Sequence, residues 1–344
     1  VCSSDLMAAA PGPRIAVTMG DPTGIGPEVI VKALSHRGIL AVCRPIVLGD
    51  RGIMERAVRL LGASIDVNEM ATAAERHYRQ GSINLLSLSS ISPAEARHGT
   101  PSPACGRAMY AYIAEAVRLT AQGEVDAITT APINKKALAD AGYSYPGHTE
   151  LLAELTGTVD YAMMLAGEKL KVVPVTIHCA LRDVFRLLTA DKIAASIRIA
   201  HRSLREYFNL PQPSIAVAAL NPHAGEGGLF GSEEETLIAP ALEQARALGI
   251  GVSGPLPPDT LFYHAAAGRY DAVICMYHDQ ALIPLKLLHF DEAVNVTLGL
   301  PIIRTSVDHG TAYDIAGTGR ANPASLVNAL KMAAMMAGSR KSRQ

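Results

Sequence analysis

The chain has 344 residues, of which 49% are hydrophobic and 18% are charged, and its formal net charge is −1. This balance is typical of a globular protein with a large core and gives no sign of a nucleic-acid or membrane-surface partner; no apolar run reaches the roughly 20 residues that a bilayer-spanning helix needs. The five cysteines include no C-x-x-C pair, which argues against a disulfide framework or a zinc ribbon and favours a reducing cytoplasm.

Val1–Leu6 joins poorly to the rest of the chain and lacks the basic and apolar regions of a signal peptide, so we expect the natural start at Met7. From there, short apolar runs alternate with longer helical patterns. The runs predicted as strands are Arg14–Met19, Pro45–Gly49, Ile83–Leu88, Asp126–Thr130, Val172–Ile177, Ser214–Leu220, Asp271–Tyr277 and Val294–Leu298. They are apolar throughout, which is typical of parallel strands buried on both faces.

The helices predicted between these strands include Pro27–His36, Arg107–Gln122, Arg182–Phe208, Glu233–Leu248 and Pro323–Ala337. Pro27 suits a first helical position, and Ser232 followed by Glu235 is typical of a capping box. The polar end Ser339–Gln344 is expected to be frayed. Alternating strands and helices predict an α/β protein with parallel sheets covered on both faces, and the length suggests about two domains.

Polar residues gather directly after four of the predicted strands. The segments are Gly20–Glu28, His178, Asn221–Gly231 and His278–Gln280. Ligands of open α/β sheets bind outside the carboxyl ends of the strands, so these residues are expected to lie at the active site. The two glycine-rich turns alone are ambiguous, and Gly20–Glu28 lacks the G-x-G-x-x-G spacing of a Rossmann fingerprint.

Three of these residues are histidines, namely His178, His223 and His278. Three imidazoles from three strand ends can converge on one divalent ion and leave a coordination position open, as in catalytic zinc sites. The alternative is three unrelated loop histidines, because their spacing matches no short ligand motif. Cys275 is a weaker ligand candidate and is more readily explained as a buried strand residue.

Anion-binding groups lie within the next segment. Lys286, Asn295 and Arg304 could hold a phosphate or carboxylate, and His148-Thr149 opens a predicted helix whose backbone N–H groups favour an anion. The alternative is that the lysine and arginine are ordinary solvated side chains.

Longer motifs resemble known families. "GDPTGIGPEV" from Gly20 is similar to a turn of the isocitrate and isopropylmalate dehydrogenases, and "DHGTAYDIAGTGRANP" from Asp308 resembles their adenosine-binding segment. The nearer resemblance is to the 4-hydroxythreonine-4-phosphate dehydrogenases of vitamin B6 synthesis. It rests on "YPGHTELLAELTG" from Tyr145, "NPHAGEGGLFGSEE" from Asn221, "YHDQALIPLK" from Tyr277 and "NVTLGLPIIRTSVDHGTAYDIAGTG" from Asn295, and it covers nearly all of Arg14 to Ala337.

The resemblance implies roles for individual residues. The family's metal ligands match His178, His223 and His278, and its substrate-binding positions match His148, Thr149, Lys286, Asn295 and Arg304. The adenosine-binding segment supplies the cofactor candidates Gly310, Asp314 and Asn322, although Asp314 could instead only shape the loop before Gly317.

The resemblance also implies two α/β/α domains around a central cleft, of the isocitrate/isopropylmalate dehydrogenase type rather than Rossmann. The expected division is residues 7–130 plus 290–344 on the cofactor side and 131–289 on the metal, substrate and dimerisation side. A homodimer is implied, with metal and substrate held near the subunit interface.

The implied reaction is NAD-dependent oxidation of 4-phosphooxy-L-threonine at C3, followed by metal-assisted decarboxylation to 3-amino-2-oxopropyl phosphate. The ion is expected to be zinc, with magnesium or cobalt as alternatives. Lys286 and Asp279 are both candidates for the proton acceptor. Remaining alternatives are a sister dehydrogenase for erythronate or threonate 4-phosphate or a cyclic diol acid, a non-catalytic metal-binding homodimer, and a zinc hydrolase.

Overall fold

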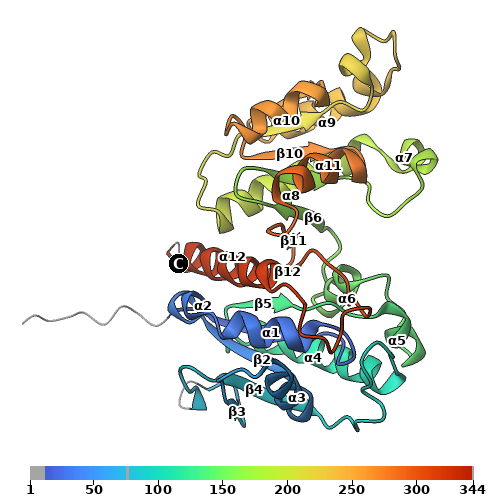
Figure 1. Cartoon of the computed structure of the whole chain (residues 1–344). Coiled ribbons are helices and arrows are strands. Elements are labelled where there is room, and N and C mark those ends of the chain that lie inside the picture. Colours follow the sequence, from blue (N-terminus) through green and yellow to red (C-terminus); the bar gives the residue numbers. More distant parts are fainter. Residues whose placement is uncertain (1–11, 75–76, 343–344) are drawn as a thin grey trace, which may run out of the picture.

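A single mixed sheet runs through the part of the chain that the computed structural model describes, residues 12–74 and 77–342 (Figure 1). The strand order is β3-β4-β2-β1-β5-β12-β11-β6-β7-β10-β8-β9. The strands are β1 (Arg14–Thr18), β2 (Arg44–Asp50), β3 (Val67–Glu69), β4 (Ile83–Ser89), β5 (Ala127–Thr130), β6 (Ala162–Ala166), β7 (Lys171–Pro174), β8 (Ile215–Ala218), β9 (Val252–Leu256), β10 (Ala272–Cys275), β11 (Val294–Leu298) and β12 (Arg304–Val307). The α/β class predicted from the sequence is confirmed. The predicted start at Met7 lies outside the described residues.

The sheet is parallel towards both ends and antiparallel in the middle. β11 runs antiparallel to both β12 and β6, and β6 runs antiparallel to β7. The expectation that Val294–Leu298 belongs to a purely parallel sheet was therefore wrong. The connection from β11 to β12 is short, and a short connection can join only antiparallel neighbours.

Four strands have no apolar β-branched run that would have marked them. β3 and β9 form the two edges of the sheet and are partly exposed, so they carry little apolar signal. β6 has the sequence AMMLA, which suits a helix as well as a strand, and β12 is largely polar although it is buried. Burial in these two comes from the pairing of distant segments and not from local sequence.

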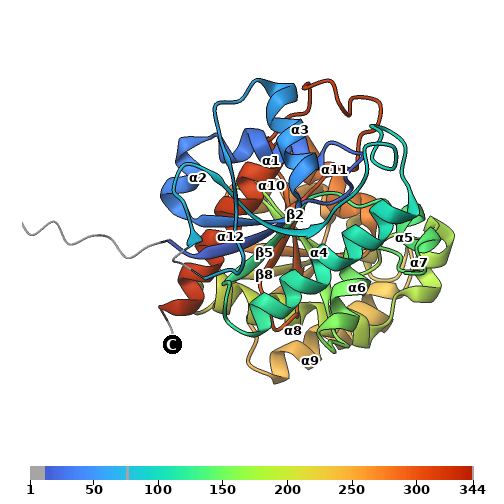
Figure 2. The same cartoon turned by 90° about the horizontal axis from the view of Figure 1, so that it is seen from below.

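The α-helices that cover the sheet are α1 (Gly26–Leu34), α2 (Arg37–Val42), α3 (Arg51–Leu61), α4 (Pro103–Ala121), α5 (Lys135–Asp140), α6 (His148–Leu155), α7 (Leu181–Leu187), α8 (Ala190–Tyr207), α9 (Ala239–Ala247), α10 (Pro258–Ala266), α11 (His278–His289) and α12 (Ala324–Lys341). In the lower half of Figure 1, α1 packs with α2, α3 and α12, while α4 packs with α5 and α6 on the other side, as the view from below shows (Figure 2). In the upper half α8 packs with α9, and α10 and α11 pack on strands β8, β10, β7 and β6. No helix among the described residues is long and apolar enough to span a membrane.

Some of the predicted helix ends and caps are confirmed by the structure, and others are not. Pro27 lies in the first turn of α1, as predicted. The predicted helix Arg182–Phe208 is two helices, because the chain turns at Leu188 and Thr189 caps α8 by accepting a hydrogen bond from the Lys192 amide. The Ser232 capping box does not form; the Ser232 carbonyl accepts instead, and a turn of π-helix comes next. α12 continues to Lys341, so Ser339, Arg340 and Lys341, which were expected to be frayed, are helical.

The strand order separates two groups of segments. β3, β4, β2, β1, β5 and β12 come from residues 14–130 and 304–307, whereas β6, β7, β10, β8 and β9 come from residues 162–256 and 272–275. The division of the chain into 7–130 plus 290–344 and 131–289 stays a prediction.

Candidate active site

Three neighbouring parallel strands each lead into one of the predicted metal-binding histidines. β10 lies between β7 and β8 in the sheet; His178 follows β7, His278 follows β10 and His223 follows β8. The buried Gln280 ties two of these strand ends together, because its Oε1 accepts from the Met276 amide at 2.7 Å and its Nε2 donates to the Ala219 carbonyl at 2.7 Å. Sheet topology thus brings all three histidine loops to one edge.

His178 and His278 lie side by side, with ring centroids 5.8 Å apart. Two imidazoles bound to one ion at the usual Zn–N distance of about 2.1 Å have centroids roughly 5–6 Å apart, so the spacing of this pair is that of two ligands of one ion. Burial lowers the pKa of His178, and the charge of Lys135 lowers it further, which favours the neutral ligand form. Asp279 Oδ1 lies 2.7 Å from His278 Nδ1, the arrangement in which a carboxylate orients a histidine and leaves its Nε2 free.

His223 stands apart from this pair. Among residues 12–74 and 77–342, no three His, Cys, Asp or Glu side chains are grouped closely enough to hold a metal. His223 is exposed, its ring lies 6.3 Å from that of Phe230, and it begins a turn in which six consecutive residues, 223–228, have positive φ. The left-handed conformation costs about 1–2 kcal/mol for each non-glycine residue, so this turn is strained at His223, Ala224 and Glu226.

A cavity of about 510 Å³ opens beside the histidine pair. Of the predicted site residues it is lined by His178, His278, Asp279, Lys286 and Asn295. Asp308 completes the polar wall and pairs with Lys286, with 2.9 Å between Lys286 Nζ and Asp308 Oδ2. Asn295 Oδ1 is buried and has no hydrogen-bond partner among the described residues, so it can accept a donor from a ligand.

Arg304 is a buried cation, only 2% exposed, on strand β12. Its hydrogen-bond partners are neutral: Nη1 donates to Thr297 Oγ1 at 2.9 Å and Nη2 to Thr130 Oγ1 at 2.7 Å, while Nε has no partner in the part of the chain that is described. Burial lowers the pKa of Arg304, and the nearby carboxylate of Glu150 raises it. A guanidinium held by hydroxyls without a paired carboxylate is prepared for an anionic ligand.

His148 belongs to the same group. It is the first residue of α6, and its Nε2 is shielded from solvent without a hydrogen-bond partner in residues 12–74 and 77–342. Burial lowers its pKa well below the ordinary histidine value, and the charges of Arg304 and Lys135 act in the same direction. Thr149 lies next in the first turn of α6 and is partly buried. Arg304 and Lys135 thus form a cationic region around His148, and Lys135 also lowers the pKa of His178.

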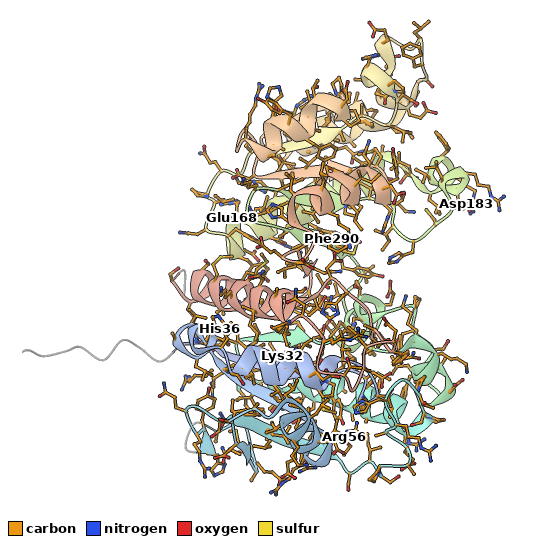
Figure 3. All side chains as sticks on the ribbon, viewed as in Figure 1. Lys32, His36, Arg56, Glu168, Asp183 and Phe290 are labelled. Carbon is orange, nitrogen blue, oxygen red and sulfur yellow. The ribbon has the colours of Figure 1, made fainter. Side chains whose placement is uncertain are left out.

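The cofactor candidates lie together on the loop between β12 and α12. Gly310 and Asp314 are exposed there, and Asn322 Oδ1 accepts a hydrogen bond from the Ala324 amide at the start of α12. Helix α1 holds this loop. Glu28 accepts from the amides of Gly317 and Gly319 at 2.5 and 2.9 Å, and Lys32, labelled in Figure 3, donates to the carbonyls of Gly319 and Ala321 at 2.6 and 2.7 Å.

A second contact fixes the same loop to the first glycine-rich turn. The Tyr313 hydroxyl donates to Asp21 Oδ2 at 2.5 Å, and the Ile25 amide donates to the Thr311 carbonyl at 3.1 Å. Burial first, and then the hydrogen bond to Asp21, raises the pKa of Tyr313. The two segments that carry the dehydrogenase-like motifs are therefore in direct contact.

Gln280 belongs to the predicted segment His278–Gln280, but sequence reasoning missed several other residues of the site: Thr130, Lys135, Glu150, Thr297 and Asp308. The rule that polar residues after strands form the site could have found Lys135, which comes after β5. It could not have found Asp308, because β12, the strand before it, was not predicted. Glu150 adjoins the predicted His148-Thr149 pair in the first turn of α6, and that position is the signal that could have found it.

Comparisons with known proteins agree with this geometry. The family model described as "Pyridoxal phosphate biosynthetic protein PdxA" matches residues 41–333. A 4-hydroxythreonine-4-phosphate dehydrogenase from Geobacter metallireducens is 56% identical over 325 residues, covering 94% of this chain and 96% of the relative. A D-threonate 4-phosphate dehydrogenase from Cupriavidus necator is 48% identical over 326 residues, covering 94% and 97%.

Among solved structures, a 4-hydroxythreonine-4-phosphate dehydrogenase from Klebsiella pneumoniae has 46% identity and a TM-score of 0.88, covering 94% of this chain and 99% of that chain. The resemblance inferred from the four long motifs and the fold that it implied are confirmed. The chain therefore belongs to the PdxA family of pyridoxal phosphate biosynthetic proteins and is a dehydrogenase.

Proposed function

We propose that this chain oxidises the C3 hydroxyl of 4-phosphooxy-L-threonine with NAD and promotes decarboxylation of the resulting β-keto acid to 3-amino-2-oxopropyl phosphate. The observation that carries the proposal is Arg304, a buried guanidinium whose hydrogen-bond partners among the described residues are hydroxyls, on the strand next to β11, whose Asn295 lines the cavity beside the His178–His278 pair. An anionic substrate bound at Arg304 would reach a site suited to a divalent ion.

The anionic ends of the substrate would be held by the cations around Arg304. Arg304, Lys286 and the amides at the start of α6 can each contact a phosphate or carboxylate oxygen, and His148, neutral at pH 7, can donate or accept one hydrogen bond. Asn295 offers an unpartnered carbonyl oxygen to a hydroxyl or ammonium group. These contacts would fix the C3 hydroxyl relative to the histidines.

His178, His223 and His278 are the residues that we propose hold the metal, and zinc suits three imidazole ligands, with magnesium or cobalt as alternatives. When bound, the ion would supply charge that favours an anionic oxygen at C3, and NAD would accept the hydride. His178 and His278 have the spacing of two ligands of one ion. His223, from its separate turn, would supply the third ligand.

The proton released from the C3 hydroxyl needs an acceptor. Asp279 contacts His278 and is placed to orient that ring. Lys286 lines the cavity directly and is paired with Asp308, so we propose that the Lys286–Asp308 pair holds and moves the proton. The cofactor would lie along Gly310, Asp314 and Asn322, whose loop is fixed by Glu28 and Lys32.

A panel of substrates tests the proposal. The chain is incubated with NAD and Zn²⁺, Mg²⁺ or Co²⁺, and NADH absorbance is monitored with 4-phosphooxy-L-threonine, D-threonate 4-phosphate and D-erythronate 4-phosphate. We expect the highest kcat/KM with 4-phosphooxy-L-threonine. A preference for D-threonate 4-phosphate, the substrate in the name of the Cupriavidus necator relative, would instead establish the alternative function.

We also propose that the chain forms a homodimer through α11. Four apolar side chains on or next to this helix are exposed, Leu287 at 84% together with Ile283, Leu288 and Phe290, the last labelled in Figure 3. Ile283 also lines the cavity, which would place the subunit interface beside the site. Light scattering should show a dimer that Leu287→Glu weakens, while Leu248→Glu at the exposed end of α9 should not; a monomeric wild type would contradict this.

A further inference from the structure

Glu234 is a buried carboxylate beside the turn that carries His223. It is 4% exposed and lies at the start of the π-helical turn Glu234–Ile238. Its Oε1 accepts hydrogen bonds from the amides of Leu220 and Asn221 at 2.8 and 2.7 Å, and its Oε2 accepts from Asn221 Nδ2 at 2.9 Å. One side chain thus receives three donors from the residues immediately before the turn.

The same carboxylate also touches the middle of the turn. A Cβ added to Gly225 would lie 2.8 Å from Glu234 Oε2, so the glycine backbone packs directly on it. The Phe230 amide donates to the Gly225 carbonyl at 3.1 Å, which closes the turn, and the Phe230 ring lies against His223. Glu234 therefore contacts both the residues just before the turn and the centre of the turn.

The turn needs such support. His223, Ala224 and Glu226 all have positive φ, at 52°, 56° and 45°, a conformation that residues with a Cβ rarely adopt. Backbone strain of this kind persists only where the surroundings enforce it, and it gathers at functional sites. By contrast, the strand end before the turn is fixed separately, through the Gln280 contact with Ala219.

We propose that Glu234 is the positioning residue for His223: its buried carboxylate holds the left-handed turn 223–228 so that this histidine can serve as the third metal ligand. The inference rests on the proposed metal site. Glu234 contacts neither substrate nor ion and acts only through the backbone that it binds.

The first test compares two carboxylates of the same π-helical turn. Glu234→Gln replaces Oε2 by an amide group that cannot accept from Asn221 Nδ2, whereas Glu235→Gln changes an exposed neighbour. Hydrogen–deuterium exchange of amides 220–231 is measured on the metal-free protein, and Zn²⁺ affinity by competition with a chromophoric chelator. In Glu234→Gln we expect faster exchange confined to this segment and Zn²⁺ binding weakened by about ten- to a hundredfold, the usual effect of removing a residue that supports a ligand.

A second pair of variants covers the case in which Glu234→Gln does not fold. Gly225→Ala places a methyl group against Glu234, whereas Gly227→Ala, also at positive φ, meets nothing within 4 Å among the described residues. Both variants carry the strain of alanine at positive φ, but only the first disturbs the carboxylate. We expect Gly225→Ala to weaken Zn²⁺ binding well beyond Gly227→Ala.

Failure of this inference is distinguishable from failure of the metal site. If Zn²⁺ does not bind the unaltered chain, the proposed metal site is wrong. In that case the positioning role is tested by hydrogen–deuterium exchange alone, and it is overturned if amides 220–231 exchange equally fast in Glu234→Gln and Glu235→Gln. If Zn²⁺ binds the unaltered chain and binds Glu234→Gln and Gly225→Ala as tightly as their controls, only the role of Glu234 is overturned.

Discussion

Lys286 Nζ lies 2.9 Å from Asp308 Oδ2 in the wall of the cavity that His178 and His278 also line. The two residues come from different parts of the chain, α11 and the end of β12, and this contact links the two sequence motifs that surround them. A lysine paired in this way can bind an anion or exchange a proton with a substrate, and substitution separates the two roles.

Lys286→Met should reduce kcat at saturating substrate by about 10²–10⁴-fold if the pair moves the proton, since that is the usual range of general acid–base catalysis. A purely binding role would raise KM and leave kcat unchanged. Steady-state kinetics of Lys286→Met and Asp308→Asn distinguish the proton-transfer role from the binding role, with Lys331→Met, at an exposed lysine, as the control. If both site variants keep the wild-type kcat and KM, the pair has neither the proton-transfer role nor the binding role.

Arg304→Met should weaken binding of the phosphorylated substrate by about ten- to a hundredfold, because a charge-assisted hydrogen bond is worth about 1.5–3 kcal/mol. The same variant should have an unchanged or higher Tm, because a buried guanidinium without a paired carboxylate is costly to the fold. Calorimetric titration and thermal unfolding measure the two effects, with the exposed Arg205→Met as the control. A large loss of stability together with intact binding would make Arg304 a structural residue.

Single substitutions His178→Ala, His223→Ala and His278→Ala should each remove most bound metal and nearly all turnover while the fold survives, because a site of three protein ligands tolerates no loss. Asp279→Asn should have a smaller effect, since it disturbs only the orientation of His278. Elemental analysis and circular dichroism measure metal and fold. Full metal occupancy in all three histidine variants would show that these histidines are not the metal ligands.

Asp314 should set the choice of cofactor. A carboxylate accepts hydrogen bonds from the ribose hydroxyls of NAD and repels the 2′-phosphate of NADP. We expect the wild type to prefer NAD by a wide margin, and Asp314→Asn or Asp314→Lys to lose this preference mainly through weaker use of NAD. The measurement is kcat/KM for both cofactors. Equal use of NADP by the wild type, or an unaltered ratio in the variants, would make Asp314 a loop residue only.

Stability should fall on acidification partly through His148. Burial lowers the pKa of His148, so the unfolded chain binds this proton more readily than the folded one. The stability that neutral His148 contributes is therefore fully present at a pH above the ordinary histidine pKa of 6.5. It declines as the pH falls towards the pKa of His148 in the folded chain, by at most about 1.4 kcal/mol per pH unit for one proton. Between pH 7.5 and 5.5, His148→Gln should lose less unfolding free energy in urea than the wild type or the exposed control His264→Gln. Parallel slopes would show that His148 does not contribute.

The sequence by itself determined the α/β class, most strands of the parallel regions and the residues that stand at their carboxyl ends. These features are local: an apolar run buries itself on both faces, and whatever polar residue comes after it must emerge at one edge of the sheet. His178, His223 and His278 could be selected in this way, and the longer motifs named the family correctly.

Only the tertiary structure decided which of these residues share an environment. The order β7-β10-β8 places the three histidine loops at one edge of the sheet, and β11, inserted antiparallel between β12 and β6, places Asn295 in the wall of the cavity that His178 and His278 line. Lys135, Glu150 and Asp308 join the site through charges and ion pairs that depend on distances across the fold. Glycines favour positive φ at 225, 227 and 228, but the positive φ of His223, Ala224 and Glu226 and the contacts of the buried Glu234 with Leu220, Asn221 and Gly225 could be seen only in the folded chain.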